Sequence, residues 1–130
     1  MRLIVTDASA LVEYLLGTRR SESVKAVVTA SDADVHVPAL CDVEVVAALR
    51  RALLGRSLTE RRAREALADY QALPLTRHGH QPLLERALTL RHNFSAYDAM
   101  YVALAEELRA ELLTADDALA RAARKYLNVS

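Results

Sequence analysis

The sequence contains few of the residues that mark secreted or membrane proteins. Its single cysteine, Cys41, has no partner for an internal disulfide, which fits a reducing cytosol. The longest uninterrupted apolar run covers only residues 99–105 and is far too short to span a membrane. The apolar residues before Thr6 are too few for a signal peptide. We therefore expect one soluble, cytoplasmic domain over residues 1–130, with no membrane contact.

Glycine and aromatic residues are also scarce. The three glycines are scattered, so the sequence has no glycine-rich loop of the kind that binds a nucleotide. Tryptophan is absent, and one phenylalanine with five tyrosines argues against a surface that stacks nucleic-acid bases. The four histidines lack the partners of a zinc site, and we expect His78 and His80 to lie in a surface loop.

The chain carries no net charge, with 17 acidic and 17 basic residues. The overall charge therefore does not indicate a nucleic-acid-binding protein, although it does not exclude a local basic patch. Fifteen of the basic residues are arginine, a side chain that binds phosphate through two hydrogen bonds. Six of these arginines gather in one region: Arg50, Arg51, Arg56, Arg61, Arg62 and Arg64.

Short apolar segments alternate with amphipathic segments along the chain. We expect strands at residues 2–6, 35–37, 73–75 and 111–114, and a last edge strand at 126–129. We expect helices at residues 8–16, 21–30, 39–54, 59–73, 82–90, 95–109 and 116–125. This alternation predicts an α/β fold in which helices cover both faces of a parallel sheet.

The first strand is followed directly by a carboxylate. Residues 3–5 form an unbroken apolar run, as expected of a central strand that is covered on both faces. Asp7 follows at the carboxyl end of the strand, where ligands bind in open α/β sheets. Asp116 follows a strand in the same way. Alternatively, Asp7 only caps the helix that begins near Ala8.

Two more acidic residues lie in apolar helical segments. Glu44 belongs to residues 40–48, a helix that is apolar nearly all round and is therefore predicted to be buried. The alternative for Glu44 is a surface contact with Arg51, two turns later. Asp98 is the only charged residue in the first turns of its helix. The alternative for Asp98 is a capping box with Ser95 as the N-cap.

Residues 114–117 also allow two interpretations. Thr114 could cap the last helix with Asp117 as its partner, which would leave Asp116 free to point into the crevice. Four carboxylates at one crevice would repel each other strongly unless a cation neutralised them. Oxygen ligands select Mg²⁺ or Mn²⁺, and such a site suits a metal-activated water that attacks a phosphate.

With these acids placed, the sequence resembles the PIN-domain ribonucleases, and most closely the VapC toxins of bacterial toxin–antitoxin pairs. The matching segments, in the family's order, are residues 4–10, Pro38 followed six residues later by Glu44, residues 95–99 and residues 114–119. The resemblance covers essentially the whole chain. It implies a three-layer α/β/α fold with a parallel, roughly five-stranded sheet.

The resemblance also implies a catalytic site and partners. It implies that four acids surround Mg²⁺ or Mn²⁺: Asp7, Glu44, Asp98 and Asp116. Ser9 and Thr114 match hydroxyl positions that support the acids, and Asp117 adjoins the fourth acid. The implied activity is endonucleolytic cleavage of structured RNA of the tRNA or rRNA class. The implied partners are a second copy of the chain in a homodimer and a small VapB-type antitoxin that blocks the site.

Other functions remain open at this point. A phosphotransferase of the haloacid-dehalogenase type also has an aspartate after its first strand, but it requires a second aspartate where this chain has Ser9. A receiver-like signalling module needs a lysine near its acidic pocket, and Lys125 is poorly placed for that role. A non-catalytic PIN scaffold is the third alternative, and the presence of all four acids argues against it. The six clustered arginines could bind RNA phosphates or an acidic antitoxin segment, or they could simply be solvated.

Overall fold

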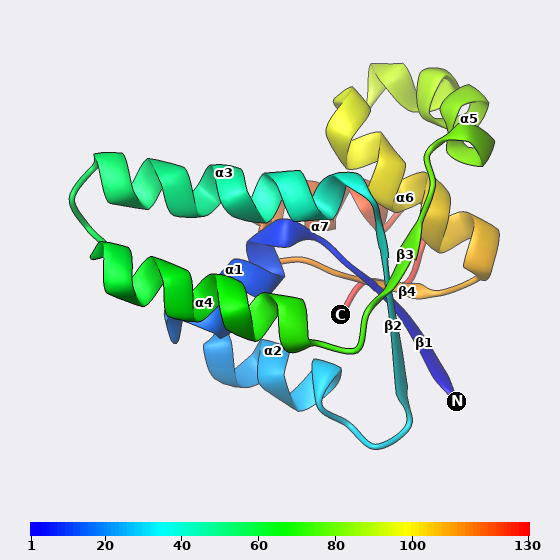
Figure 1. Ribbon diagram of the computed structural model, residues 1–130. Helices are drawn as coiled ribbons and strands as arrows, with labels where there is room; N and C mark the ends of the chain where they lie inside the picture. Colours follow the sequence, from blue (N-terminus) through cyan, green and yellow to red (C-terminus); the bar gives the residue numbers. More distant parts are fainter.

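The computed structural model describes all 130 residues, Met1–Ser130. Its sheet has four parallel strands in the order β3-β2-β1-β4 (Figure 1). The strands are β1 (Arg2–Thr6), β2 (Ala33–Pro38), β3 (Thr76–His78) and β4 (Glu111–Leu113). The α-helices are α1 (Ala8–Leu16), α2 (Ser21–Val28), α3 (Leu40–Leu54), α4 (Glu60–Ala72), α5 (Leu84–Thr89), α6 (Ala96–Leu108) and α7 (Asp117–Ala123). Two 3₁₀ turns, η1 (Gln81–Leu83) and η2 (Leu90–His92), flank α5.

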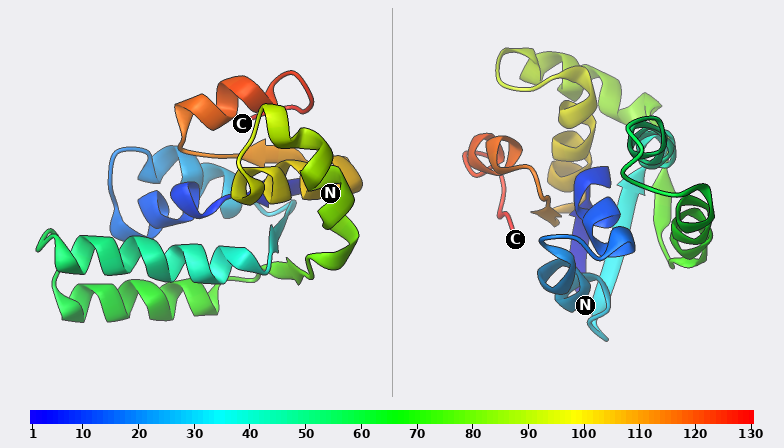
Figure 2. Two further views of the ribbon diagram at one scale, coloured as in Figure 1. Left: turned by 90° about the horizontal axis from the view of Figure 1, so that it is seen from above. Right: turned by 90° about the vertical axis from the view of Figure 1, so that its left-hand side faces the viewer.

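Helices cover both faces of the sheet, as the resemblance implies. Ile4 of β1 is fully buried on one face, where it clusters with Ala10 of α1 and Val24 of α2. On the other face α6 packs on β1 and β2 (Figure 2). Val5 of β1 is also fully buried, so β1 has apolar cover on both sides. The fold is therefore a three-layer α/β/α arrangement with β1 in its interior.

Helices α3 and α4 form an antiparallel pair that extends past the carboxyl ends of the strands (Figures 1 and 2). This pair and the turn between its helices contain the six clustered arginines, and α3 carries the predicted site residue Glu44. None of the helices combines the length and apolar character needed to cross a membrane.

The expected fifth strand is reduced to a single bridge. Val129 pairs with Leu112, and the backbone bonds around it join Leu112 to Asn128 and Ser130. The preceding residues turn instead of extending, since the N–H groups of Tyr126 and Leu127 both donate to the carbonyl oxygen of Ala123, and the ring of Tyr126 packs on Phe94. The prediction of a strand over residues 126–129 is therefore wrong, and the sheet has four strands.

The third strand lies three residues later than predicted. The apolar side chains of Leu73 and Leu75 pack against the core without forming a strand. Pro74 between them has no N–H to donate to a strand ladder. The strand itself is formed by Thr76, Arg77 and His78, whose polar character suits an edge position.

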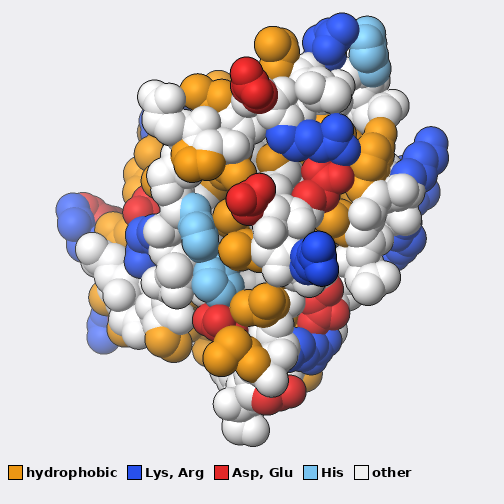
Figure 3. All heavy atoms as spheres, turned by 90° about the vertical axis from the view of Figure 1, so that its right-hand side faces the viewer, with side chains coloured by type: hydrophobic (Ala, Val, Ile, Leu, Met, Phe, Trp, Pro, Cys, Tyr) orange, Lys and Arg blue, Asp and Glu red, His pale blue; other side chains and the backbone are white.

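The expectation that His78 and His80 lie in a surface loop is wrong for His78 and right for His80, which lies in the short loop between β3 and η1 and is half-buried. His78 belongs to β3, and its Nε2 lies 2.9 Å from Nδ1 of His36. The Nε2 of His80 accepts a hydrogen bond from the backbone N–H of Leu40, at the start of α3. Histidine side chains accordingly gather on the face shown in Figure 3, over the β2–β3 edge.

Candidate active site

Five carboxylates line one cavity at the carboxyl ends of β1 and β4. The cavity has a volume of about 420 Å³. Its acidic side chains are Asp7, Glu13, Glu44, Asp98 and Asp116. The structure therefore brings the four predicted acids together from separate parts of the chain, and adds Glu13 of α1 at the margin. Glu13 was missed because its position on a helix face gave no signal, and its Oε2 is already bonded to Thr18 and to the backbone of Arg20.

Asp7 is the most deeply buried acid of the site, with 5% of its surface exposed. Its Oδ1 accepts hydrogen bonds from the Ser9 hydroxyl at 2.7 Å and from the Ala10 N–H at 3.0 Å. Its Oδ2 accepts a bond from the Thr114 hydroxyl at 2.5 Å. Asp7 therefore caps α1 and faces the cavity at the same time, so the two interpretations of this residue do not exclude each other.

Burial raises the pKa of Asp7 to about 6, even though its three hydrogen bonds act in the opposite direction. The nearby carboxylate of Asp98 raises it further. The three hydrogen bonds therefore do not fully compensate the Asp7 carboxylate for its loss of solvation.

Two hydroxyls join the ends of β1 and β4. Besides donating to Asp7, the Ser9 oxygen accepts a bond from the Ala115 N–H at 3.1 Å. The Thr114 oxygen accepts a bond from the Asp116 N–H at 3.0 Å. Each hydroxyl therefore contacts Asp7 and the segment that carries Asp116, which fixes these two acids relative to one another.

Asp116 caps α7. Its Oδ1 accepts bonds from the N–H groups of Ala118 and Leu119, at 2.9 and 3.1 Å. The hypothesis that Thr114 caps this helix is therefore wrong, because Thr114 is occupied at the end of β4. Asp116 reaches the cavity from this capping position, as Asp7 does.

The structure does not bring Asp117, predicted as a supporting residue, to the site. Its carboxylate pairs with Arg20 at 2.6 Å, and 63% of the side chain is exposed. The guanidinium of Arg20 lowers the pKa of Asp117. Asp117 does not line the cavity.

Asp98 faces the cavity and does not complete a capping box. Ser95 is the N-cap of α6, because its hydroxyl oxygen accepts a bond from the Asp98 N–H at 3.1 Å. No reciprocal bond runs from the Ser95 N–H to the Asp98 carboxylate, although the Ser95 side chain lies near enough to lower the pKa of that carboxyl. Burial raises the pKa of Asp98, and the charges of Asp116 and Glu44 raise it further.

Glu44 is oriented by a tyrosine that the sequence did not single out. The hydroxyl of Tyr101, a residue with 1% of its surface exposed, donates to Oε1 of Glu44 at 2.5 Å. The available signal was helical spacing, since Tyr101 lies three residues after Asp98 on the same side of α6. The alternative partner for Glu44 is wrong, because Arg51 makes no ion pair with it.

These carboxylates fit a hard divalent cation that keeps part of its water shell. Burial raises the pKa of Asp7 and of Asp98, and neighbouring carboxylates raise both further, so a bound cation would favour their charged forms. No three acidic, histidine or cysteine side chains lie close enough together in this structure to hold a metal ion between them. An open set of carboxylate oxygens is what Mg²⁺ typically uses, since it dehydrates reluctantly and binds through one or two carboxylates and several waters.

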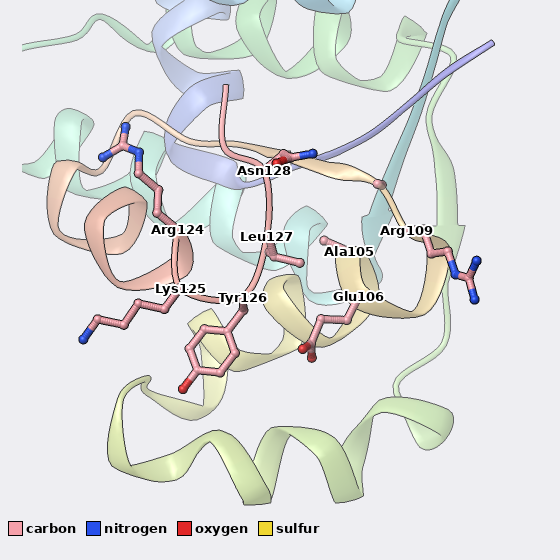
Figure 4. Close-up of a pocket in the computed structure, with 9 residues that line it drawn as sticks. Ala105, Glu106, Arg109, Arg124, Lys125, Tyr126, Leu127 and Asn128 are labelled. Carbon is pink, nitrogen blue, oxygen red and sulfur yellow. The ribbon is translucent and has the colours of Figure 1, made fainter.

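A larger cavity, of about 610 Å³, lies beside the carboxyl ends of α6 and α7. Its cationic side chains, Arg109, Arg124 and Lys125, point away from one another (Figure 4). Its one acid, Glu106, is paired with Arg86 at 2.8 Å. With no convergent polar groups, this cavity is a weaker candidate for chemistry than the acidic one.

Comparison with known proteins identifies the family of this chain. The model of the PIN domain family matches residues 4–125. Ribonuclease VapC1 of Mycobacterium tuberculosis is 43% identical over 119 residues, which cover 91% of this chain and 89% of that protein.

Two solved structures share the fold. The crystal structure of Mycobacterium tuberculosis VapC20, a Sarcin-Ricin loop cleaving toxin, has a TM-score of 0.68 at 20% identity, and covers 92% of this chain and 94% of its own. That of VapBC2 from Rickettsia felis, bound to a DNA fragment from their promoter, has a TM-score of 0.64 at 13% identity, with 98% and 97% covered. Sequence and fold agree, and the chain belongs to the PIN-domain family and, within it, to the VapC ribonucleases.

Proposed function

We propose that the protein is a divalent-metal-dependent endoribonuclease and the toxin of a VapBC-type toxin–antitoxin pair. The observation that carries this proposal is the convergence of Asp7, Glu44, Asp98 and Asp116 on one cavity at the carboxyl end of the sheet. When bound, Mg²⁺ or Mn²⁺ supplies a Lewis acid and a water of lowered pKa for attack on a phosphodiester.

In this proposal some residues would bind the metal, and others orient the metal-binding carboxylates. Asp7, with its two oxygens fixed by Ser9, Ala10 and Thr114, would be the most rigid ligand of the metal. Asp98 and Asp116 would complete the ligand set from α6 and α7. Glu44 would contact a water at the metal site through its Oε2, because its Oε1 already accepts a hydrogen bond from the Tyr101 hydroxyl.

The proposed substrate is structured RNA of the tRNA or rRNA class. Support comes from the family to which the chain belongs and from its fold neighbour VapC20, a Sarcin-Ricin loop cleaving toxin. The scarcity of aromatic residues favours contacts with the RNA backbone over stacking on bases.

The proposed partners are a VapB-type antitoxin and a second copy of the chain, in the cytoplasm. The fold neighbour VapBC2 and the VapC family membership support the antitoxin. Exposed apolar side chains on α3, α5 and α6 support a protein interface: Val43 and Val46, Leu84 and Leu88, and Tyr97. The buried, unpaired thiol of Cys41 fits a reducing compartment.

The test is cleavage of a labelled structured RNA by purified protein with Mg²⁺ or Mn²⁺, with EDTA, and with the variants Asp7→Asn and Asp117→Asn. We expect cleavage that needs the metal, is abolished by Asp7→Asn and is retained by Asp117→Asn, whose carboxylate lies outside the site. Cleavage that persists in EDTA and in Asp7→Asn would refute the proposed mechanism.

A further inference from the structure

The structure separates the six clustered arginines into groups with different surroundings. Three of them are engaged on α4. Arg61 pairs with Glu65, Arg64 pairs with Glu60, and Arg62 donates to the carbonyl oxygen of Leu15. Arg56 lies in the turn between α3 and α4. Arg50 and Arg51, adjacent on α3, make no ion pair.

Arg50 and Arg51 line different cavities. Arg50 lies beside an apolar groove between α3 and α4, together with Leu49 and Leu53. Arg51 lines the acidic cavity, one helix face away. It follows Glu44 by seven residues on α3, which places its backbone about 10 Å along the helix from that acid. Arg51 therefore lies at the rim of the site and not among the carboxylates.

Arg51 is the only cationic side chain that lines this cavity, beside five acids. It forms no ion pair and no hydrogen bond with any of them. The nearest predicted partner, Glu44, is engaged by the Tyr101 hydroxyl. The guanidinium is thus exposed and has all its donors available next to a strongly acidic site.

An RNA strand entering this cavity meets five carboxylates and one cationic side chain, Arg51. A planar guanidinium can bind two oxygens of one phosphate, which fixes the position of a strand without reading its bases. On the face shown in Figure 3, acidic and basic side chains are intermixed, so that face carries no continuous basic track.

We propose that Arg51 binds a phosphate of the RNA strand that neighbours the phosphate being cut, and so aligns the strand along α3. The inference rests on the proposed nuclease function. It assigns Arg51 to substrate positioning, whereas the four acids hold the metal. The other arginines of α3 and α4, Arg50, Arg61, Arg62 and Arg64, are not assigned to binding this phosphate.

The experiment compares Arg51→Gln, Arg51→Lys and the control Arg50→Gln with the wild type. We measure RNA cleavage as a function of RNA concentration at several salt concentrations. For Arg51→Gln we expect KM to rise roughly tenfold with kcat nearly unchanged, as for the loss of one charge-assisted bond. The logarithmic salt slope should become shallower by about 0.7, the value for one lost phosphate contact with a single strand.

The other two variants separate charge from geometry. Arg51→Lys keeps the charge and should keep the wild-type salt slope, but it loses the two-point contact and should show an intermediate KM. Arg50→Gln should match the wild type in both measurements. Direct titration with Mn²⁺ gives a readout independent of activity, and metal affinity should be unchanged or slightly higher in Arg51→Gln, because a cation has been removed.

Three outcomes would overturn the inference. Unchanged KM and salt slope in Arg51→Gln, while the wild type cuts RNA, contradict it and leave the nuclease function standing. Weakened Mn²⁺ binding with unchanged RNA affinity would assign Arg51 to the metal site instead. A wild-type protein that neither binds nor cuts RNA with either metal would refute the proposed function, and this inference with it.

Discussion

The hydroxyl of Tyr101 donates a hydrogen bond to Oε1 of Glu44, so that a buried residue of α6 orients an acid of α3. The bond links the two helices that carry half of the predicted acids, since Asp98 lies one turn before Tyr101. An outer hydrogen-bond donor of this kind fixes the direction in which a carboxylate presents its free oxygen.

Tyr101→Phe should therefore impair activity more than stability. The ring stays in place and the half-buried Glu44 can recruit water, so we expect a loss of about 1 kcal/mol in the free energy of unfolding. Loss of an outer-shell partner lowers metal affinity or activity by roughly 10–100-fold. Chemical denaturation, Mn²⁺ titration and RNA cleavage measure the three quantities.

A matched control is available in Tyr70→Phe. The Tyr70 hydroxyl donates to Asp42 at 2.5 Å, and neither residue lines the acidic cavity. Tyr70→Phe should lose similar stability and keep its metal affinity and activity. If both variants lose activity equally, the effect of Tyr101 is on stability alone and the orienting role is wrong.

The stability of the metal-free protein should fall as pH rises toward neutrality. The pKa of Asp7 is raised from 3.8 to about 6, so between these values the folded protein holds a proton that the unfolded chain has released. Folding stability therefore decreases with increasing pH in this window, by up to about 3 kcal/mol for a shift of this size.

The measurement is the free energy of unfolding in EDTA between pH 4 and pH 7, for the wild type and for Asp7→Asn. The difference between the two proteins should change across the window, because the variant lacks the titrating carboxyl group. Metal affinity should rise over the same range, since a metal ligand must be deprotonated. Parallel pH profiles for the two proteins would mean that Asp7 is not held in an unfavourable charged state.

Most of the fold could be predicted from the sequence, because it depends on local apolar patterns. The unbroken run before Asp7 indicated a buried central strand, and β1 is that strand. The edge of the sheet could not be predicted in this way. Residues 76–78 are polar, and they form β3 only because β2 offers them backbone partners. Residues 126–129 have the composition of a strand, but the N–H groups of Tyr126 and Leu127 turn back to the carbonyl oxygen of Ala123, and Tyr126 packs on Phe94.

The site was predictable to the extent that each acid was unusual in its own segment. The local sequence could not decide which of two neighbouring residues caps a helix and which one faces the cavity. Asp116 and Asp117 are equally able to cap a helix, and the choice of Asp116 depends on Thr114 and Arg20, which come from other elements. The partnership of Tyr101 with Glu44 depends on the packing of α6 beside α3, which no local pattern encodes.

The variant Asp98→Asn distinguishes a role of Asp98 in helix stability from a role in metal binding. The carboxylate of Asp98 accepts no hydrogen bond from the Ser95 N–H, while its own backbone N–H is capped by the Ser95 hydroxyl. Removing its charge from a group of repelling carboxylates should leave the metal-free protein as stable as before, or more stable. A gain of about 1 kcal/mol would raise the melting temperature of a domain of this size by roughly 3–6 °C.

Activity of Asp98→Asn should nevertheless collapse, and added metal should reveal why. A ligand present at 100 times its Kd stabilises the folded state by about 2.7 kcal/mol, so Mg²⁺ or Mn²⁺ should raise the melting temperature of the wild type. The variant should respond much less, because one ligand has lost its charge. Asp117→Asn is the control, and it should keep both its activity and its response to metal, since Asp117 pairs with Arg20 outside the cavity. A destabilised Asp98→Asn protein that still cuts RNA would show that Asp98 serves the helix and not the metal.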